Sequence, residues 1–194
     1  SISNNVSKIT PELSSSILGS TGTRPRAIAA DSAGNIYTAN YGSNNVSKIT
    51  PGGTSTILGT TGTSPHAITA DSAGNIYSAN IGSDNVSKIT PDGTSTILGT
   101  TGTRPRAIMV DSAGNIYTTN YGSNDVSKIT PDGTSTILGT TGTNPAAITV
   151  DSAGNIYTAN WGSNNLSKIT PDGASTTNWA ATDTGPLVIT VDSA

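Results

Sequence analysis

Short apolar segments alternate with turn sequences along the whole chain. Residues 24–63 contain four segments rich in Ile, Val, Thr or Tyr, which are "AIAA" at 27–30, "NIYTAN" at 35–40, "NVSKIT" at 45–50 and "STILG" at 55–59. Their length and their β-branched and aromatic content predict β-strands, here called strands a, b, c and d. "DSAG" between strands a and b, and forms such as "PDGT" at 91–94 between strands c and d, supply Asp and Gly for tight turns. No segment has a helical period, so the pattern predicts an all-β protein.

The four-strand pattern repeats every 40 residues. "DSAGN" begins at Asp31, Asp71, Asp111 and Asp151, and "SKIT" begins at Ser7, Ser47, Ser87, Ser127 and Ser167. Four short strands in about 40 residues are the unit of a β-propeller, whose blades pack face to face. Both faces of each blade are then expected to be buried, which would place the following side chains in the interior: Ile28, Ile36, Tyr37, Val46, Ile49, Ile57 and Leu58.

The blade boundaries follow from the repeat. We expect one β-propeller domain over residues 1–194, with complete blades at 24–63, 64–103, 104–143 and 144–184. A fifth, closing blade would combine residues 185–194 with residues 1–23, but it lacks a "GNIYTAN" strand b. Residues 1–5 or a second chain could fill that place, so the protein is either a monomer or an oligomer that completes this blade. The chain could also be a fragment of a longer array.

The repeats resemble those of a known group. The stretch "AITVDSAGNIYTANWGSNNLSKITPDG" at 147–173 is similar to NHL-type repeats and to the repeats of streptogramin-lyase-like propellers. The resemblance implies the propeller fold, but these repeats support RNA binding, protein binding, sensing and lyase chemistry alike. The lyase chemistry it implies uses paired histidines, a glutamate and a magnesium ion. Because the chain has one His, His66, and one Glu, Glu12, no catalytic residue carries over, and we expect a non-enzymatic protein without a cofactor.

Composition narrows the classes of partner. The chain has no Cys, which leaves neither disulfides nor thiolate metal sites. Only 11% of residues are charged and the net charge is −3, so nucleic acid is a disfavoured partner. No apolar run approaches the roughly 20 residues of a membrane span, so no membrane partner is expected. Much Ser, Thr, Asn and Gly without Phe suits a secreted or cell-surface bacterial protein.

Differences between the repeats lie mainly on one side of the propeller. Residues 64–103 and 104–143 differ at nine positions, five of which lie in or beside the d-to-a and b-to-c connections, and none in "DSAGN" or "PDGT". These two kinds of connection share one face of a propeller. All arginines, the only histidine and several aromatic residues lie there, which predicts a ligand-binding set of Arg24, Arg26, Tyr41, His66, Arg104, Arg106, Tyr121 and Trp161.

The predicted function is a non-enzymatic binding or adhesion module that uses this face. Carbohydrate is the leading ligand class, as in a lectin, because repeated blades offer several similar shallow sites; a protein ligand is also open. Three alternatives remain: solvated loop positions that vary because packing does not constrain them, an engineered or reconstructed repeat scaffold without a ligand, and a lyase-like enzyme. The aspartates of "DSAGN" are predicted to cap turns, so no metal site is expected.

Overall fold

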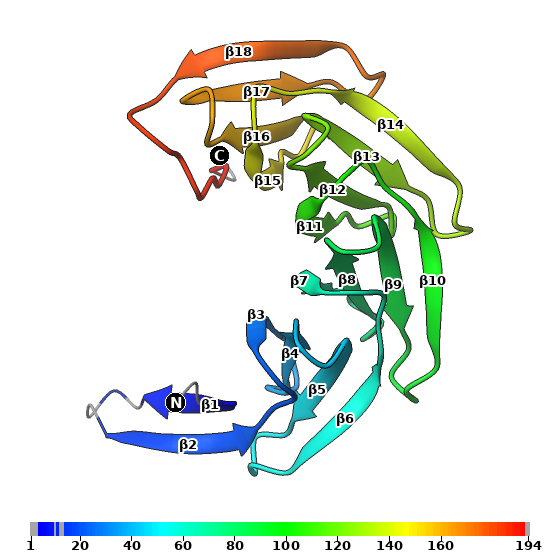
Figure 1. Cartoon of the computed structure of the whole chain (residues 1–194), viewed down its shortest axis with the longest axis vertical. Helices are drawn as coiled ribbons and strands as arrows, with labels where there is room; N and C mark the ends of the chain where they lie inside the picture. Colours follow the sequence, from blue (N-terminus) through cyan, green and yellow to red (C-terminus); the bar gives the residue numbers. More distant parts are fainter. Residues whose placement is uncertain (1–3, 10, 12–13, 193–194) are drawn as a thin grey trace.

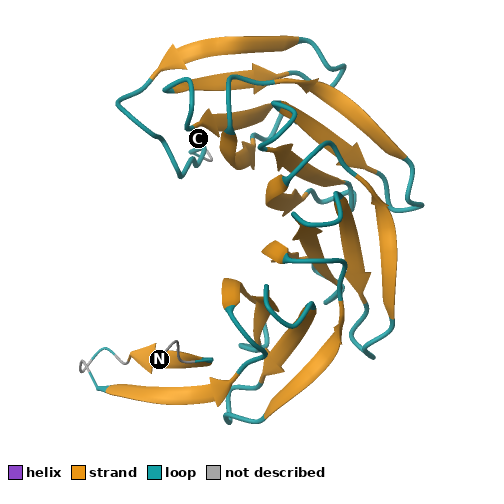
Figure 2. Cartoon of the chain, viewed as in Figure 1, coloured by secondary structure: helices purple, strands orange, loops and turns teal. Residues whose placement is uncertain are grey.

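The computed structural model describes residues 4–9, 11 and 14–192. The described chain is built from strands and loops without a helix (Figure 2). It therefore contains no helix that could cross a membrane. The strands form one two-stranded and four four-stranded antiparallel sheets, which confirms the all-β propeller prediction.

Each four-stranded sheet is one blade whose strands follow one another in chain order. Blade 1 is β3–β6 (Pro25–Ala30, Ile36–Asn40, Asn45–Ile49, Ser55–Thr60). Blade 2 is β7–β10 (Pro65–Ala70, Ile76–Asn80, Asn85–Ile89, Ser95–Thr100). Blade 3 is β11–β14 (Pro105–Val110, Ile116–Asn120, Asp125–Ile129, Ser135–Thr140). Blade 4 is β15–β18 (Pro145–Val150, Ile156–Asn160, Asn165–Ile169, Ser175–Ala181). These bounds agree with the predicted strands a to d to within one or two residues.

The sheets are arranged along an open arc (Figure 1). The first strands of the blades, β3, β7, β11 and β15, line its concave side, and the last strands, β6, β10, β14 and β18, lie on its convex side. The N-terminal hairpin of β1 (Asn5–Ile9) and β2 (Ser15–Ser20) lies at one end of the arc, and blade 4 lies at the other.

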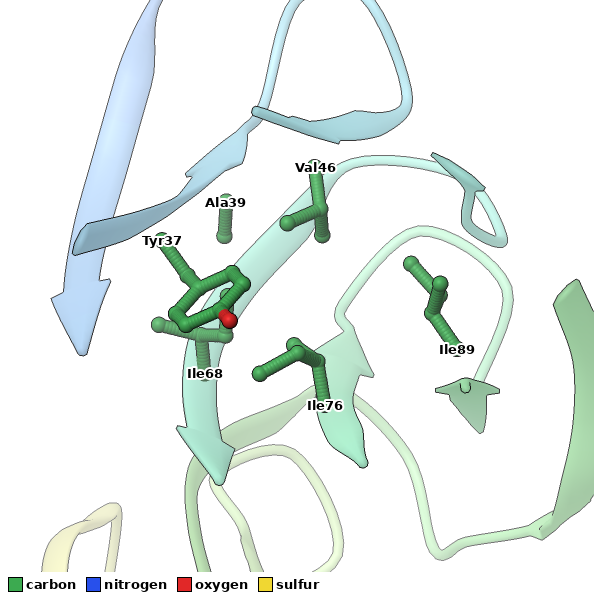
Figure 3. Packing of buried hydrophobic residues seen from close by; sticks show 6 residues of the cluster. All are labelled: Tyr37, Ala39, Val46, Ile68, Ile76 and Ile89. Atoms are coloured by element: carbon green, nitrogen blue, oxygen red, sulfur yellow. The ribbon is translucent and has the colours of Figure 1, made fainter. Parts of the chain in front are cut away.

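The core lies between successive blades. In the first cluster, Tyr37 and Ala39 of β4 and Val46 of β5 face Ile68 and Ile76 of blade 2 (Figure 3), with Ile89 beside them. Equivalent clusters lie between blades 2 and 3 and between blades 3 and 4. Tight packing between the blades therefore fixes each inner strand relative to the next.

Two of the residues predicted to be buried are exposed. Ile57 in the outermost strand of blade 1 is 55% exposed, whereas the next residue of the strand, Leu58, packs against the core between blades 1 and 2. Ile28 is 58% exposed although the corresponding Ile68 is buried. Ile68 is covered by β4 of the preceding blade, whereas the sheet before Ile28 is a hairpin without the strands that would cover it.

The hairpin is the part of the predicted closing blade that forms a sheet. Residues 182–192 form no strand, although the sequence analysis expects a strand a from 185 onward; residues 193–194 lie outside the described part. Strand a pairs with strand b of its own blade in blades 1 to 4. Since no strand b lies beside residues 185–192, their backbone groups lack the ladder that would make them a strand.

Candidate functional site

The d-to-a and b-to-c connections are joined by hydrogen bonds into one surface, here called the loop face. In blade 3, the backbone N–H of Thr103 donates to Ser123 Oγ over 3.0 Å, and the N–H of Tyr121 donates to the carbonyl of Arg104 over 3.0 Å. Buried Asn120, at the end of β12, donates to Ser127 Oγ over 2.8 Å, and Ser127 Oγ also accepts the N–H of Gly102. The two connections are therefore held together from beneath by a buried polar network.

The loop face contains unusual backbone conformations at the arginine positions. Arg24 and Arg104 have φ values of 53° and 56°, in the left-handed region, and Asn144 occupies the same repeat position at 54°. Asparagine tolerates this region far better than arginine does. The N–H of Arg104 donates to the carboxylate of Asp84 over 2.7 Å, so each blade also anchors the loop of the next.

A cavity of about 310 Å³ lies on the loop face. It is lined by Arg24, Arg26, Tyr41, His66, Ile81, Arg104, Arg106 and Tyr121. Seven of these were predicted from the sequence, since only Ile81 is new. Ile81 occupies the repeat position of Tyr41 and Tyr121, so alignment of the copies could have found it.

Trp161 is the predicted residue that lies apart from this cavity. It is 46% exposed and belongs to blade 4. A Cβ atom at Gly185 would lie 2.8 Å from its Nε1, so the indole packs closely against the connection that follows blade 4. Trp161 occupies the same repeat position as Tyr41 and Tyr121, in the b-to-c connection, but the cavity is lined by residues of blades 1 to 3 only.

Two groups of side chains from the same repeat positions approach the cavity from blades 1 and 3. In blade 1 the guanidinium carbon of Arg24 lies 5.0 Å from the centre of the Tyr41 ring. In blade 3 those of Arg104 and Arg106 lie 5.4 Å and 4.7 Å from the centre of the Tyr121 ring. Cation–π contact orients these guanidinium groups while leaving their N–H donors available.

His66 lies between the two groups, in blade 2. Its Nδ1 lies 3.0 Å from the backbone carbonyl of Arg106, and since a carbonyl only accepts, Nδ1 carries the proton. Burial, together with the nearby charges of Arg26 and Arg106, lowers the pKa of His66 below its ordinary value of 6.5. The imidazole is therefore neutral at pH 7, with Nε2 as a hydrogen-bond acceptor.

The cavity is electrostatically one-sided. Four arginines line it, and no carboxylate does so among the described residues. A concave site lined by charge of one sign concentrates ions of the opposite sign. The Mg²⁺ ion that the family resemblance implies does not fit this lining, because guanidinium groups cannot act as its oxygen ligands. Glu12 lies outside the described residues.

The opposite face contains the capped turns. Asp111 accepts the N–H groups of Ala113 and Asn115 and the hydroxyl of Tyr117, at 2.8 to 3.1 Å. Asp31, Asp71 and Asp151 make equivalent bonds to the Asn and Tyr of their own turns. The carboxylates act as caps, as predicted, and the described residues contain no group of three or more His, Asp or Glu that could hold a metal ion.

Comparisons with known proteins agree with the fold. The virginiamycin B lyase family matches residues 2–160. The solved structure of selenomethionine-substituted virginiamycin B lyase from Staphylococcus aureus is similar, with 22% identity, a TM-score of 0.70, and coverage of 79% of this chain and 55% of that one. The structure of a catalytically inactive variant of the same enzyme with quinupristin has 21% identity and a TM-score of 0.76, and the match covers 90% of this chain and 62% of that one. The structure of a streptogramin B lyase has 20% identity and a TM-score of 0.74, and the match covers 92% of this chain and 63% of that one.

The chain spans less than two thirds of the length of these lyases. At identities near 20% the likeness concerns the fold alone. No curated protein sequence matches the chain.

Proposed function

Because the chain belongs to the virginiamycin B lyase family and has a propeller fold, we propose that it is a non-catalytic binding module that takes a carbohydrate in the loop-face cavity. One observation carries the proposal: arginine, tyrosine and histidine residues chosen from the repeat differences come from three blades and line one cavity. If these positions differed between the repeats only because packing does not constrain them, the differing residues would be expected to be scattered around the loop face.

The chemistry of the cavity suits a saccharide. Guanidinium groups donate hydrogen bonds to hydroxyl or anionic oxygens, and neutral His66 can accept a hydrogen bond from a hydroxyl at Nε2. The volume of about 310 Å³ is at the lower end of the range for ligand pockets. A small saccharide, or one end of a longer one, fits this size.

The second candidate is a lyase-like enzyme, which family membership favours. The sequence weighs against it, since one His and one Glu do not supply the paired histidines that the family chemistry implies. Incubation with quinupristin separates the two candidates. Cleavage of quinupristin by the purified chain would favour the lyase, whereas an intact compound is expected of a binding module.

A glycan array tests the binding function. The test variant is R24N/R26A/R104N/R106A, which gives both loops the Asn-Pro-Ala that blade 4 already carries at 144–146. Since these residues are accommodated at the same repeat position, the fold should be kept. We expect binding to weaken by about tenfold or more, because charge-assisted hydrogen bonds of about 1.5–3 kcal/mol each are lost.

The matched control removes the same charge elsewhere. The variant K48Q/K88Q/K128Q/K168Q changes the net charge by the same amount, and these lysines lie over tyrosines of strand b, not in the cavity. It should bind glycans like the unmodified protein. Equal binding by the arginine variant would overturn the proposal.

A further inference from the structure

We infer that the ligand of the loop-face cavity is an acidic saccharide with two anionic groups, one for each Arg-Pro-Arg loop; this inference rests on the proposed function. The starting point is a partial repeat. Blades 1 and 3 carry the same triplet, at 24–26 and 104–106, together with Tyr41 and Tyr121, while blade 2 between them carries Ser-Pro-His and Ile81. The cavity is thus lined by two copies of one cationic group.

The backbone conformation at Arg24 and Arg104 supports a role in ligand binding. Arg24 and Arg104 adopt left-handed conformations, where a residue such as arginine is strained. Asn144 shows what the loop itself accommodates well, since its side-chain amide donates to the carbonyl of Tyr121 over 3.2 Å. Arginine at two such positions, both at one cavity, is costly for folding and is accounted for by a contact with a ligand.

The charges define how many anionic groups the ligand carries. Each loop brings two guanidinium groups, and no described carboxylate in the lining neutralises them. A single anionic group would pair with the arginines of one segment and leave those of the other segment without an anionic partner. Two carboxylates or sulfates give each Arg-Pro-Arg loop an acceptor for forked hydrogen bonds.

The middle of the cavity defines what joins the two anionic groups. His66 and Ile81 of blade 2 are uncharged at pH 7, and His66 Nε2 accepts a hydrogen bond. A neutral, hydroxylated part such as a sugar ring fits there. A nucleic acid fits less well, because its phosphate backbone needs an extended basic track. The arginines of this acidic chain are confined to the Arg-Pro-Arg segments at the starts of blades 1 and 3.

Titration calorimetry with a charge series tests the inference. The probes are digalacturonate, its monomethyl and dimethyl esters, and a disulfated disaccharide, so that carboxylate and sulfate are compared. We expect the affinity of digalacturonate to exceed that of the dimethyl ester by about 100-fold, with the monoester between them. The half-site variants R24N/R26A and R104N/R106A should each bind digalacturonate only as tightly as the unmodified protein binds the monoester.

The outcomes separate this inference from the function on which it rests. If both esters bind as tightly as digalacturonate and the four-arginine variant loses them all, the saccharide function stands and the two-anion inference falls. If no saccharide binds, both fall. If a single-stranded oligonucleotide binds with steep salt dependence while the saccharides do not, the ligand is a nucleic acid and the inference is overturned.

Discussion

Arg104 has a strained backbone and also lines the cavity. One substitution should therefore change the stability of the protein and its affinity for the ligand in opposite directions. At φ 56° it occupies the position that Asn144 fills in blade 4. We expect Arg104→Asn to stabilise the protein by up to about 1 kcal/mol, because relief of strain exceeds the loss of an exposed cation–π contact with Tyr121. Ligand affinity should fall in the same variant, as in other trade-offs between stability and activity.

Urea denaturation measures this change, and Arg106→Ala is its control. Arg106 lies in β11 and is not among the residues with a left-handed backbone, so its removal relieves no strain. A variant Arg104→Asn that unfolds at a lower urea concentration than the unmodified protein would show that the arginine stabilises the loop, and the strain argument would fail.

At the scale of the residue, seven members of the predicted set line the cavity, and they were chosen because they are deviations from a repeat. Arg24, Arg26, Arg104 and Arg106 stand out against copies that otherwise agree. Trp161 was predicted with them because a repeat position identifies a face of the propeller. It does not say how far along the arc a cavity extends, and that depends on the curvature of the assembled blades.

One side chain, the aspartate at its start, holds the turn between strands a and b; in blade 3 this residue is Asp111. Burial alone would raise the pKa of Asp111, but hydrogen bonds from Asn115 and Tyr117 outweigh it and hold the pKa below the ordinary 3.8. The same contacts account for the Tyr117 hydroxyl, whose pKa is raised to about 12 by burial and by Asp111. The ionised carboxylate thus stabilises the folded blade.

We expect Asp111→Ala to lower the free energy of unfolding at pH 7 by about 2 kcal/mol, since several charge-assisted hydrogen bonds are lost together. The folded-state pKa is the lower one, so the contribution is present above pH 3.8 and disappears as the pH falls below it. The difference between the two proteins should therefore shrink in acid. Ser112→Ala, at the exposed next position, is the control and should change little; a loss equal to that of Asp111→Ala would contradict the capping role.

At the scale of the element, strand positions followed from local signals, whereas burial did not. β-branched residues between the glycine-containing turns "DSAG" and "PGGT" locate the strands of blade 1 closely. Ile57 has the same local signal as a buried isoleucine, yet it is exposed on the outer strand, while its neighbour Leu58 packs against the core. The position of the strand in its blade and the face of the strand together distinguish the two cases.

The whole molecule behaves as a row of stacked units, in which each blade is stabilised by the units that pack against it. Blade 2 has a complete neighbour on each side, whereas the N-terminal hairpin has two strands and lies at the end of the arc. The contrast appears in one sequence, "NVSKI", which forms both β1 and β9: Ile9 is 70% exposed and the matching Ile89 is fully buried. The cavity lies over blades 1 to 3, so it includes blade 2, which has a complete neighbour on each side.

Native-state hydrogen exchange should show this gradient of stability. Amides of β1 that bond to β2 should exchange at least about 100-fold faster than the matching amides of β9 that bond to β10. The reason is that opening the hairpin breaks few buried apolar contacts. The identical sequence is an internal control, since intrinsic exchange rates depend mainly on neighbouring side chains. Equal protection of the two strands would mean that the hairpin is held as firmly as blade 2, and stability would not follow the packing along the arc.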